Sequence, residues 1–243
     1  MNTRRMCVAA LALATCLSGA AQAALYDRGG GLIYDSDLNV TWLQDANYAK
    51  TSGYDADGQM DWYQATTWAA NLSYYDSVRN VTYTDWRLPT VNPVNGSSFN
   101  ASLTYNGSSD IGYNISAPGT AYAGSTSSEM AHLFYSELNN KGYYDTAGAG
   151  PQAGWGLVNK GPFTNILSFT AYWSGTAYAP DTSHALVFHF NYGYQDQIYK
   201  TFTVPTAWAV RDGDVATVPE ADTWVMLLAG LGLVSVAARR RRG

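Results

Sequence analysis

Short apolar runs near the start of the chain give way to a helical spacing of apolar residues. Residues 31–43 contain two apolar runs around Asp35-Ser36-Asp37. Asp and Ser side chains bond their own backbone in turns, so this pattern predicts a β-hairpin. Asp61 and Gln64 form a capping pair for a helix that is expected to run to about residue 72. One face of that helix carries Trp62, Ala65, Ala69 and Leu72.

The middle of the chain combines a weak pattern with a clear helix. Pro89, in the run Asp85-Trp86-Arg87-Leu88-Pro89-Thr90, forces the residues before it to be extended. Residues 92–125 have neither a helical nor a strand period, and we predict a long polar surface insertion there. Thr126 and Glu129 form the capping box of a second helix. Its apolar stripe and its end are marked by Met130, Leu133, Phe134 and Leu138, and by Asn139, Asn140 and Gly142.

Strand patterns dominate the last part of the domain. Four short runs rich in aromatic and β-branched residues are separated by turn residues, as in an antiparallel meander. They are 171–178, 184–191, 198–204 and 207–211. Two helices early and strands late predict an α+β fold, with two helices, an antiparallel sheet and long loops.

The first residues have the three-part layout of a secretory signal. Arg4 and Arg5 precede an apolar run over residues 6–17, and small residues follow, with Ala21 and Ala23 at the positions that a signal peptidase reads. The run is too short to cross about 30 Å of hydrocarbon. We therefore predict a signal helix over 1–23 that is cleaved after Ala23. A lipoprotein signal ending at Cys16 is the alternative, although Thr15 fits that pattern poorly.

The last residues resemble a PEP-CTERM sorting tail. Val218, Pro219 and Glu220 precede an apolar stretch over 224–238, and four arginines follow it directly. These are Arg239, Arg240, Arg241 and Arg242. Basic residues stay on the cytoplasmic side, so both ends of the chain predict that residues 24–217 lie outside. We expect 218–243 to be a tail with a short membrane helix, held in the inner membrane before an exosortase-type enzyme processes it. An ordinary C-terminal anchor is the alternative.

Composition narrows the function of residues 24–217. This segment has eight Lys or Arg against 17 Asp or Glu, a formal charge of −9. Such a surface repels polyanions, which disfavours nucleic acid as a partner. Both cysteines, Cys7 and Cys16, lie in the predicted signal, so the mature domain would hold no thiol or disulfide.

Six short motifs in order give the domain a family resemblance. They are Leu32-Ile33-Tyr34-Asp35 with Thr41-Trp42-Leu43; Asp55-Ala56-Asp57-Gly58; Trp86-Arg87-Leu88-Pro89; Ser128-Glu129-Met130; Tyr172-Trp173-Ser174-Gly175; and Ala207-Trp208-Ala209-Val210-Arg211-Asp212. The domain resembles the Lcl carboxy-terminal-domain-like family. The resemblance implies a C-type-lectin-like fold whose first and last strands meet, with long loops that display a ligand-binding surface. It implies no catalysis. Trp86, Trp173 and Trp208 are expected to be core residues, since each lies in a strand-like apolar pattern.

Two groups of residues are candidate binding sites. Asp55, Asp57 and Asp61 surround a glycine turn and could bind Ca²⁺, although the spacing fits an EF-hand loop only in part; an Asp-Gly turn followed by Asp61 as a helix cap is the favoured explanation. No other cofactor is expected. Within the insertion, Tyr105, Tyr113 and Tyr122 stand among Asn and Ser, a composition typical of adaptable binding loops.

The remaining chemistry points away from catalysis. His184 and His189 are five apart in a predicted strand and cannot share one metal, while His132 is expected to be packed and hydrogen-bonded. Arg87 and Arg211 each follow a Trp and are expected to pair with a carboxylate or an aromatic ring. Without a catalytic motif, we expect no enzyme. The leading hypothesis is an exported lectin-like module of the cell surface, envelope or exopolysaccharide matrix that binds a polysaccharide or other surface ligand. The export machinery and the exosortase-type enzyme are its other partners. A structural matrix component and a polysaccharide hydrolase are the alternatives.

Overall fold

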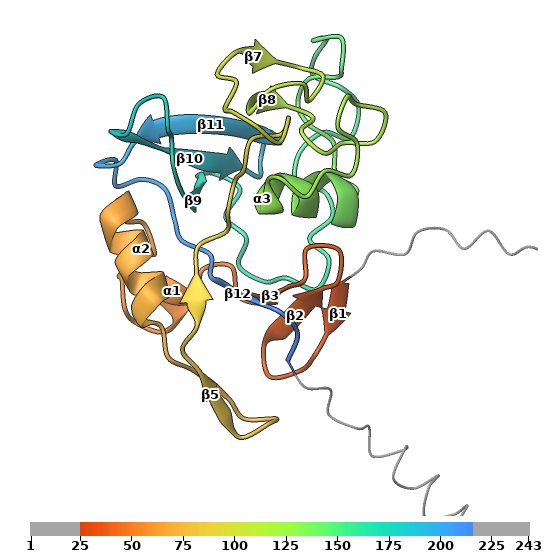
Figure 1. Ribbon diagram of the computed structural model, residues 1–243. Helices are drawn as coiled ribbons and strands as arrows, with labels where there is room; N and C mark the ends of the chain where they lie inside the picture. The colour runs from red at the N-terminus through yellow and green to blue at the C-terminus, as the bar shows by residue number, and fades with distance from the viewer. Residues whose placement is uncertain (1–24, 216–243) are drawn as a thin grey trace, which may run out of the picture.

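The computed structural model describes residues 25–215, which form two five-stranded sheets, a two-stranded hairpin and short helices (Figure 1). The helices are α1 (Tyr48–Thr51), α2 (Trp62–Asn71), α3 (Glu129–His132) and the π-helix η1 (Leu133–Glu137). The strands are β1 (Leu25–Asp27), β2 (Leu32–Asp35), β3 (Val40–Leu43), β4 (Tyr74–Asp76), β5 (Val81–Tyr83), β6 (Trp86–Arg87), β7 (Leu103–Thr104), β8 (Ile111–Tyr113), β9 (Tyr172–Ala177), β10 (His184–His189), β11 (Tyr194–Tyr199) and β12 (Val210–Asp212). This mixture confirms the α+β class.

The first sheet joins the two ends of the described chain, in the order β1-β2-β3-β12-β6. The predicted hairpin is confirmed: β2 pairs with β3, and Asp35 Oδ1 accepts the backbone N–H of Asp37 and Leu38 in the turn. Strand β12 lies between β3 and β6, with Val210 opposite Trp42. Strands from the start and the end of the domain therefore meet in the middle of one sheet, as the resemblance implies.

Helix α2 begins where its capping pair predicts. The Asp61 carboxylate accepts the Gln64 backbone N–H at 2.8 Å, and the Gln64 side chain accepts the Asp61 N–H at 3.2 Å. Both bonds satisfy backbone donors that the first helical turn leaves free. Ala65 and Ala69 are buried on the inner face, together with Trp68.

The second sheet has the order β7-β8-β11-β10-β9. Strands β9 and β10 lie where predicted, but the strand predicted at 198–204 is wrong in position, because β11 begins at Tyr194. Gly193, at φ 67°, allows a tight turn directly after β10. The polar residue Gln195 then lies buried in β11, whereas the apolar Phe202 beyond the strand is 53% exposed. Because β11 contains polar residues, its apolar pattern does not mark the position of the strand.

Residues 92–125 differ from the prediction of an insertion without a strand pattern, because they contain β7 and β8. Buried apolar residues such as Ile111 and Ile115 anchor the segment. The buried Asp110 carboxylate accepts the backbone N–H of Val94 and of Asn100, both at 2.7 Å. Side-chain bonds to the backbone thus organise this segment in place of a periodic apolar pattern.

The second helix has a different start from the predicted one. Its cap is Ser128, whose hydroxyl accepts the Ala131 N–H, and Thr126 lies outside the helix. Glu129 turns away from the helix terminus because Arg87 holds its carboxylate at 2.8 Å. The predicted apolar stripe is confirmed, since Met130, Leu133, Phe134 and Leu138 are all buried.

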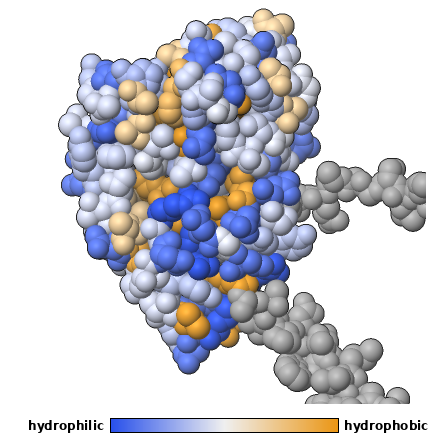
Figure 2. All heavy atoms as spheres, in the orientation of Figure 1, coloured by the Kyte–Doolittle hydropathy of each residue, from blue (hydrophilic) through white to orange (hydrophobic). Residues whose placement is uncertain are grey.

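One hydrophobic core lies between the two sheets and the helices. The predicted core tryptophans are confirmed: Trp86 is 4% exposed, and Trp173 and Trp208 are fully buried. Their indole N–H groups donate to the carbonyl oxygens of Tyr83, Met60 and Leu43, respectively. On the face shown in Figure 2, hydrophilic residues predominate and apolar residues form separate patches. Among residues 25–215, no helix is long and apolar enough to cross a membrane.

Candidate functional site

A row of aromatic rings crosses the second sheet from strand to strand. His189 at the end of β10 lies opposite Tyr194 of β11, and Tyr194 lies opposite Tyr113 of β8. The His189 and Tyr194 rings are 5.7 Å apart at 27°, and the Tyr194 and Tyr113 rings are 4.8 Å apart at 25°. Tyr105, just after β7, extends the row with a ring 5.8 Å from Tyr113. Side chains at paired positions project from the same face, so the register itself builds this row.

A second set of rings comes from a loop and a turn beside this row. Tyr143 and Tyr144 lie in the loop that follows η1, and Tyr192 lies in the β10–β11 turn. The Trp155 and Tyr192 rings are stacked at 5.7 Å and 2°, and these side chains are 37% and 41% exposed. The two sets of rings border an open groove of about 490 Å³. It is lined by Tyr113, Tyr143, Tyr144, His189, Tyr192, Tyr194 and Asp196. We call it the aromatic groove.

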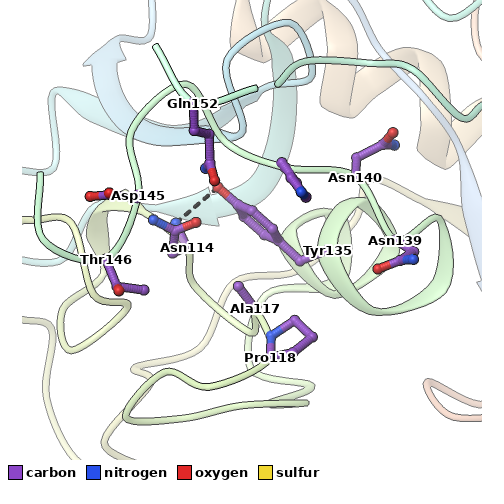
Figure 3. A pocket seen from close by; sticks show the side chains of 10 residues that line it. Asn114, Ala117, Pro118, Tyr135, Asn139, Asn140, Asp145, Thr146 and Gln152 are labelled. Atoms are coloured by element: carbon purple, nitrogen blue, oxygen red, sulfur yellow. Dashed lines mark hydrogen bonds between the residues drawn. The ribbon is translucent and has the colours of Figure 1, made fainter. Parts of the chain in front are cut away.

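Buried polar contacts fix the walls of the aromatic groove. Tyr135 of η1 donates its hydroxyl to the Gly193 carbonyl at 2.6 Å. The same oxygen accepts the Asn114 N–H at 2.9 Å (Figure 3). Asn114 Nδ2 donates to the carbonyls of Tyr105 and Tyr144, so one side chain ties the row of rings to the loop. A Cβ on Gly193 would meet the Tyr135 hydroxyl at 2.5 Å, which explains glycine in this turn.

The polar groups of the aromatic groove are one carboxylate, one imidazole and several phenols. Burial lowers the pKa of His189 and outweighs the nearby Asp196 charge, so the imidazole is neutral at pH 7. Burial raises the pKa of Tyr113 to about 12 and also raises that of Tyr194, with Asp196 adding to the shift at Tyr194. Neutral phenols can donate and accept hydrogen bonds, and the Asp196 carboxylate can accept them.

A second cavity of about 300 Å³ is lined by residues that include Asn114, Tyr135, Asn140 and Gln152 (Figure 3). Several of its polar side chains are hydrogen-bonded to the protein backbone. Gln152 Nε2 donates to the carbonyls of Gly142 and Tyr144, and Asn140 Nδ2 donates to the Asn159 carbonyl. Because Gln152 and Asn140 already serve the backbone, and the aromatic groove offers more aromatic ring faces, we take the groove as the better candidate for ligand binding.

Comparison with protein families gives one assignment. Residues 217–242 match the PEP-CTERM protein-sorting motif. No curated protein and no solved structure matches the chain. The PEP-CTERM motif indicates an exported protein that is anchored in the membrane before an exosortase-type enzyme processes it.

The PEP-CTERM motif covers the predicted sorting residues Val218, Pro219 and Glu220 and the arginines at 239–242. These residues, the predicted membrane segment 224–238, and the signal with Ala21 and Ala23 lie outside the described residues. The aromatic groove thus belongs to a domain whose sorting motif begins within two residues of its described end.

Two of the three tyrosines predicted as loop ligands belong to the aromatic row. Tyr113 lines the groove and Tyr105 stacks behind it, whereas Tyr122, which is 36% exposed, does not line it. Sequence reasoning missed the rest of the groove. The pair Tyr194 and Asp196 was its one local signal, because residues two apart in a strand share a face.

The three candidate Ca²⁺ ligands serve the backbone around them. Asp55 Oδ1 accepts the N–H of Asp57 and of Gly58, and Asp57 Oδ1 accepts the Gln59 N–H. That last bond is the main cause of a lowered pKa at Asp57. Asp61 caps α2. Ca²⁺ binding at these carboxylates stays a prediction.

The basic residues singled out in the sequence have the structural roles expected of them. Arg87 contacts both Glu129 and Asp212, and these carboxylates outweigh the effect of burial and raise its pKa. Arg211 pairs with Asp85 at 2.7 Å and lies over the Tyr83 ring. His132 is buried and hydrogen-bonded as predicted, with Nε2 at 3.2 Å from a Glu137 oxygen.

Proposed function

We propose that the chain is an exported, non-catalytic protein of the cell envelope or exopolysaccharide matrix, whose domain binds carbohydrate in the aromatic groove. The PEP-CTERM motif supports the export and sorting. The groove supports the binding, because it combines ring faces with a small number of hydrogen-bonding groups, as ligand sites do. We further propose that the domain belongs to the Lcl carboxy-terminal-domain-like family with a C-type-lectin-like fold. The six motifs and the pairing of β3 with β12 support this assignment.

The aromatic groove suits a sugar chain for two physical reasons. The Trp155 and Tyr192 side chains are partly exposed, and a ring face that is not used in their own stack can cover the apolar C–H face of a pyranose ring. Asp196, His189 and the phenols can exchange hydrogen bonds with the sugar hydroxyls. Rigid rings also lose little conformational entropy when a ligand binds.

The number of carboxylates in the aromatic groove favours a binding role over hydrolysis. Glycoside cleavage normally uses a pair of carboxyl groups on either side of the scissile bond. Among the described residues that line the groove, Asp196 is the single carboxylate. The presence of a single carboxylate is the observation that supports a non-catalytic role.

The test is binding of the full chain, purified in detergent, to a glycan array and to exopolysaccharide, with and without Ca²⁺. We expect Tyr192→Ala to weaken binding about tenfold, equivalent to about 1.4 kcal/mol. Tyr54→Ala is the matched control, because Tyr54 is 57% exposed and lies outside the groove. Equal binding by the wild type and Tyr192→Ala, or no glycan binding in either condition, would overturn the proposal.

A further inference from the structure

A histidine and two carboxylates converge where the β2–β3 hairpin meets the junction of α3 and η1. His132 Nε2 lies 3.2 Å from Glu137 Oε1 and 4.0 Å from Asp37 Oδ2. One potential ligand atom from each residue lies within 4.8 Å of the others. His132 and Glu137 are buried, while the Asp37 side chain is 57% exposed and closes the cluster from the solvent side.

The π-helix brings His132 and Glu137 together. These residues are five apart, and in an α-helix of 3.6 residues per turn their side chains would point about 140° from each other. The wider turn of a π-helix, with its bonds between residues five apart, reduces that angle. The Leu138 N–H donates to the Leu133 carbonyl at 2.9 Å, which is one such bond. Single π turns occur frequently at functional sites.

The His132 ring is oriented as a metal ligand requires. Its Nδ1 lies 3.1 Å from the Ser125 carbonyl oxygen. A carbonyl only accepts hydrogen bonds, so Nδ1 carries a proton and donates it there. A cation at this place would replace the proton that Nε2 otherwise shares with Glu137, and the Nε2 lone pair would then face the carboxylates of Asp37 and Glu137. A backbone carbonyl bound to the other ring nitrogen is the usual support of a metal-binding histidine.

A third carboxyl group is buried beside the cluster. Asp35 is fully buried, and its Oδ2 has no hydrogen-bond partner, although the Trp42 indole lies against the carboxyl. Asp35 Oδ1 accepts the backbone N–H of Asp37 at 3.1 Å, so this carboxyl lies in the same turn as the cluster residue Asp37. A buried anion needs a compensating positive charge.

We propose that Asp37, His132 and Glu137 bind a divalent transition-metal cation of the Zn²⁺ type, with the Asp35 carboxylate as a further anion beside it. Three ligands that bind one Zn²⁺ at about 2 Å lie about 3.3 Å from one another, so the donors need only small side-chain movements. One imidazole with carboxylates suits Zn²⁺ better than Ca²⁺, which prefers oxygen ligands alone. The bound cation would link the hairpin of the first sheet to the helix that supports the aromatic groove.

The experiment is isothermal titration of the chelator-treated full chain, purified in detergent, with Zn²⁺ and separately with Ca²⁺. We expect Asp37→Asn and His132→Gln each to weaken one Zn²⁺ site at least about tenfold. Asp37→Asn should fold normally because this side chain is largely exposed. His184→Gln is the matched control, since His184 also contacts an aspartate, Asp181 at 2.9 Å, but lies outside the cluster. Zn²⁺ should also raise the unfolding temperature of the wild type and of His184→Gln more than that of Asp37→Asn.

Two results would overturn the proposal. One is equal Zn²⁺ affinity of the wild type and Asp37→Asn, and the other is no Zn²⁺ binding by the wild type. In the second case the His132 imidazolium and the Glu137 carboxylate form an ion pair within the core. Glycan binding plays no part in this readout, so the carbohydrate proposal can fail or succeed independently.

Discussion

At the scale of single residues, Arg87 and Arg211 show how one sequence pattern leads to two energetic situations. Each follows a Trp-containing strand segment, and each pairs with a carboxylate. The Glu129 side chain that Arg87 contacts is only 8% exposed and also accepts the Thr90 N–H at 2.7 Å. The Asp85 side chain that Arg211 contacts is 57% exposed. Solvent screens the second pair far more than the first.

We therefore expect Glu129→Ala to lower the free energy of unfolding by about 3 kcal/mol, because it leaves Arg87 partly buried with less compensating charge. Asp85→Ala should lower it by only about 0.5 kcal/mol. Urea unfolding of both variants measures the difference. Similar losses of unfolding free energy in Glu129→Ala and Asp85→Ala would show that the Arg87–Glu129 pair stabilises the domain no more than the exposed Arg211–Asp85 pair.

His189 gives the domain a pH dependence with a defined sign. Burial holds its pKa below the usual 6.5, so the unfolded chain takes up the proton first as the pH falls. The stability from neutral His189 is present above the unfolded pKa and is lost as the pH falls through the folded value. Between about pH 8 and about pH 5, the wild type should lose more stability than His189→Gln, measured by urea unfolding at each pH. Parallel losses would show that His189 does not titrate in this way.

At the scale of elements, the sequence predicted helix starts and turns correctly where a nearby side chain hydrogen-bonds the backbone. Asp61 and Gln64 cap α2 as predicted, and Asp35 closes the β2–β3 turn. Signals failed where distant residues supply the bonds. Gln195 makes β11 look polar, yet its amide donates to the Asp110 carbonyl and accepts the Ser128 hydroxyl proton. Such partners are 85 and 67 residues away, and no local pattern records them.

Replacing this buried glutamine tests its role as a link between β11, β8 and α3. Gln195→Leu should lower the free energy of unfolding by about 2 kcal/mol, because it leaves the Ser128 hydroxyl and the Asp110 carbonyl buried without these partners. Gln197→Leu on the same strand is the control and should change it by less than about 0.5 kcal/mol, since Gln197 is partly exposed. Equal effects in urea unfolding would show that the amide bonds contribute little.

At the scale of the whole molecule, the sequence predicted the α+β fold class and the meeting of the first and last strands. It did not predict the candidate site. The aromatic groove takes Tyr113 from β8, Tyr143 from a loop and Tyr194 from β11, and these converge only once the second sheet has formed. The metal cluster likewise depends on a π-helix that the helical pattern of 126–138 does not distinguish from an α-helix.

The position of β12 predicts the effect of shortening the chain. Because β12 lies between β3 and β6, a chain that stops after Ala209 would split the first sheet and expose Trp42 and Trp208. We expect it to lack a cooperative unfolding transition in circular dichroism, whereas a chain that ends at Thr217 should retain one. A folded protein that ends at Ala209 would show that β12 is dispensable.

The central place of β12 also sets an order of events during export. Nearly the entire domain must emerge from the translocation channel before its first sheet can close, and the residues that complete the sheet emerge just ahead of the PEP-CTERM motif. The last strand of the first sheet and the sorting motif therefore leave the channel one directly after the other.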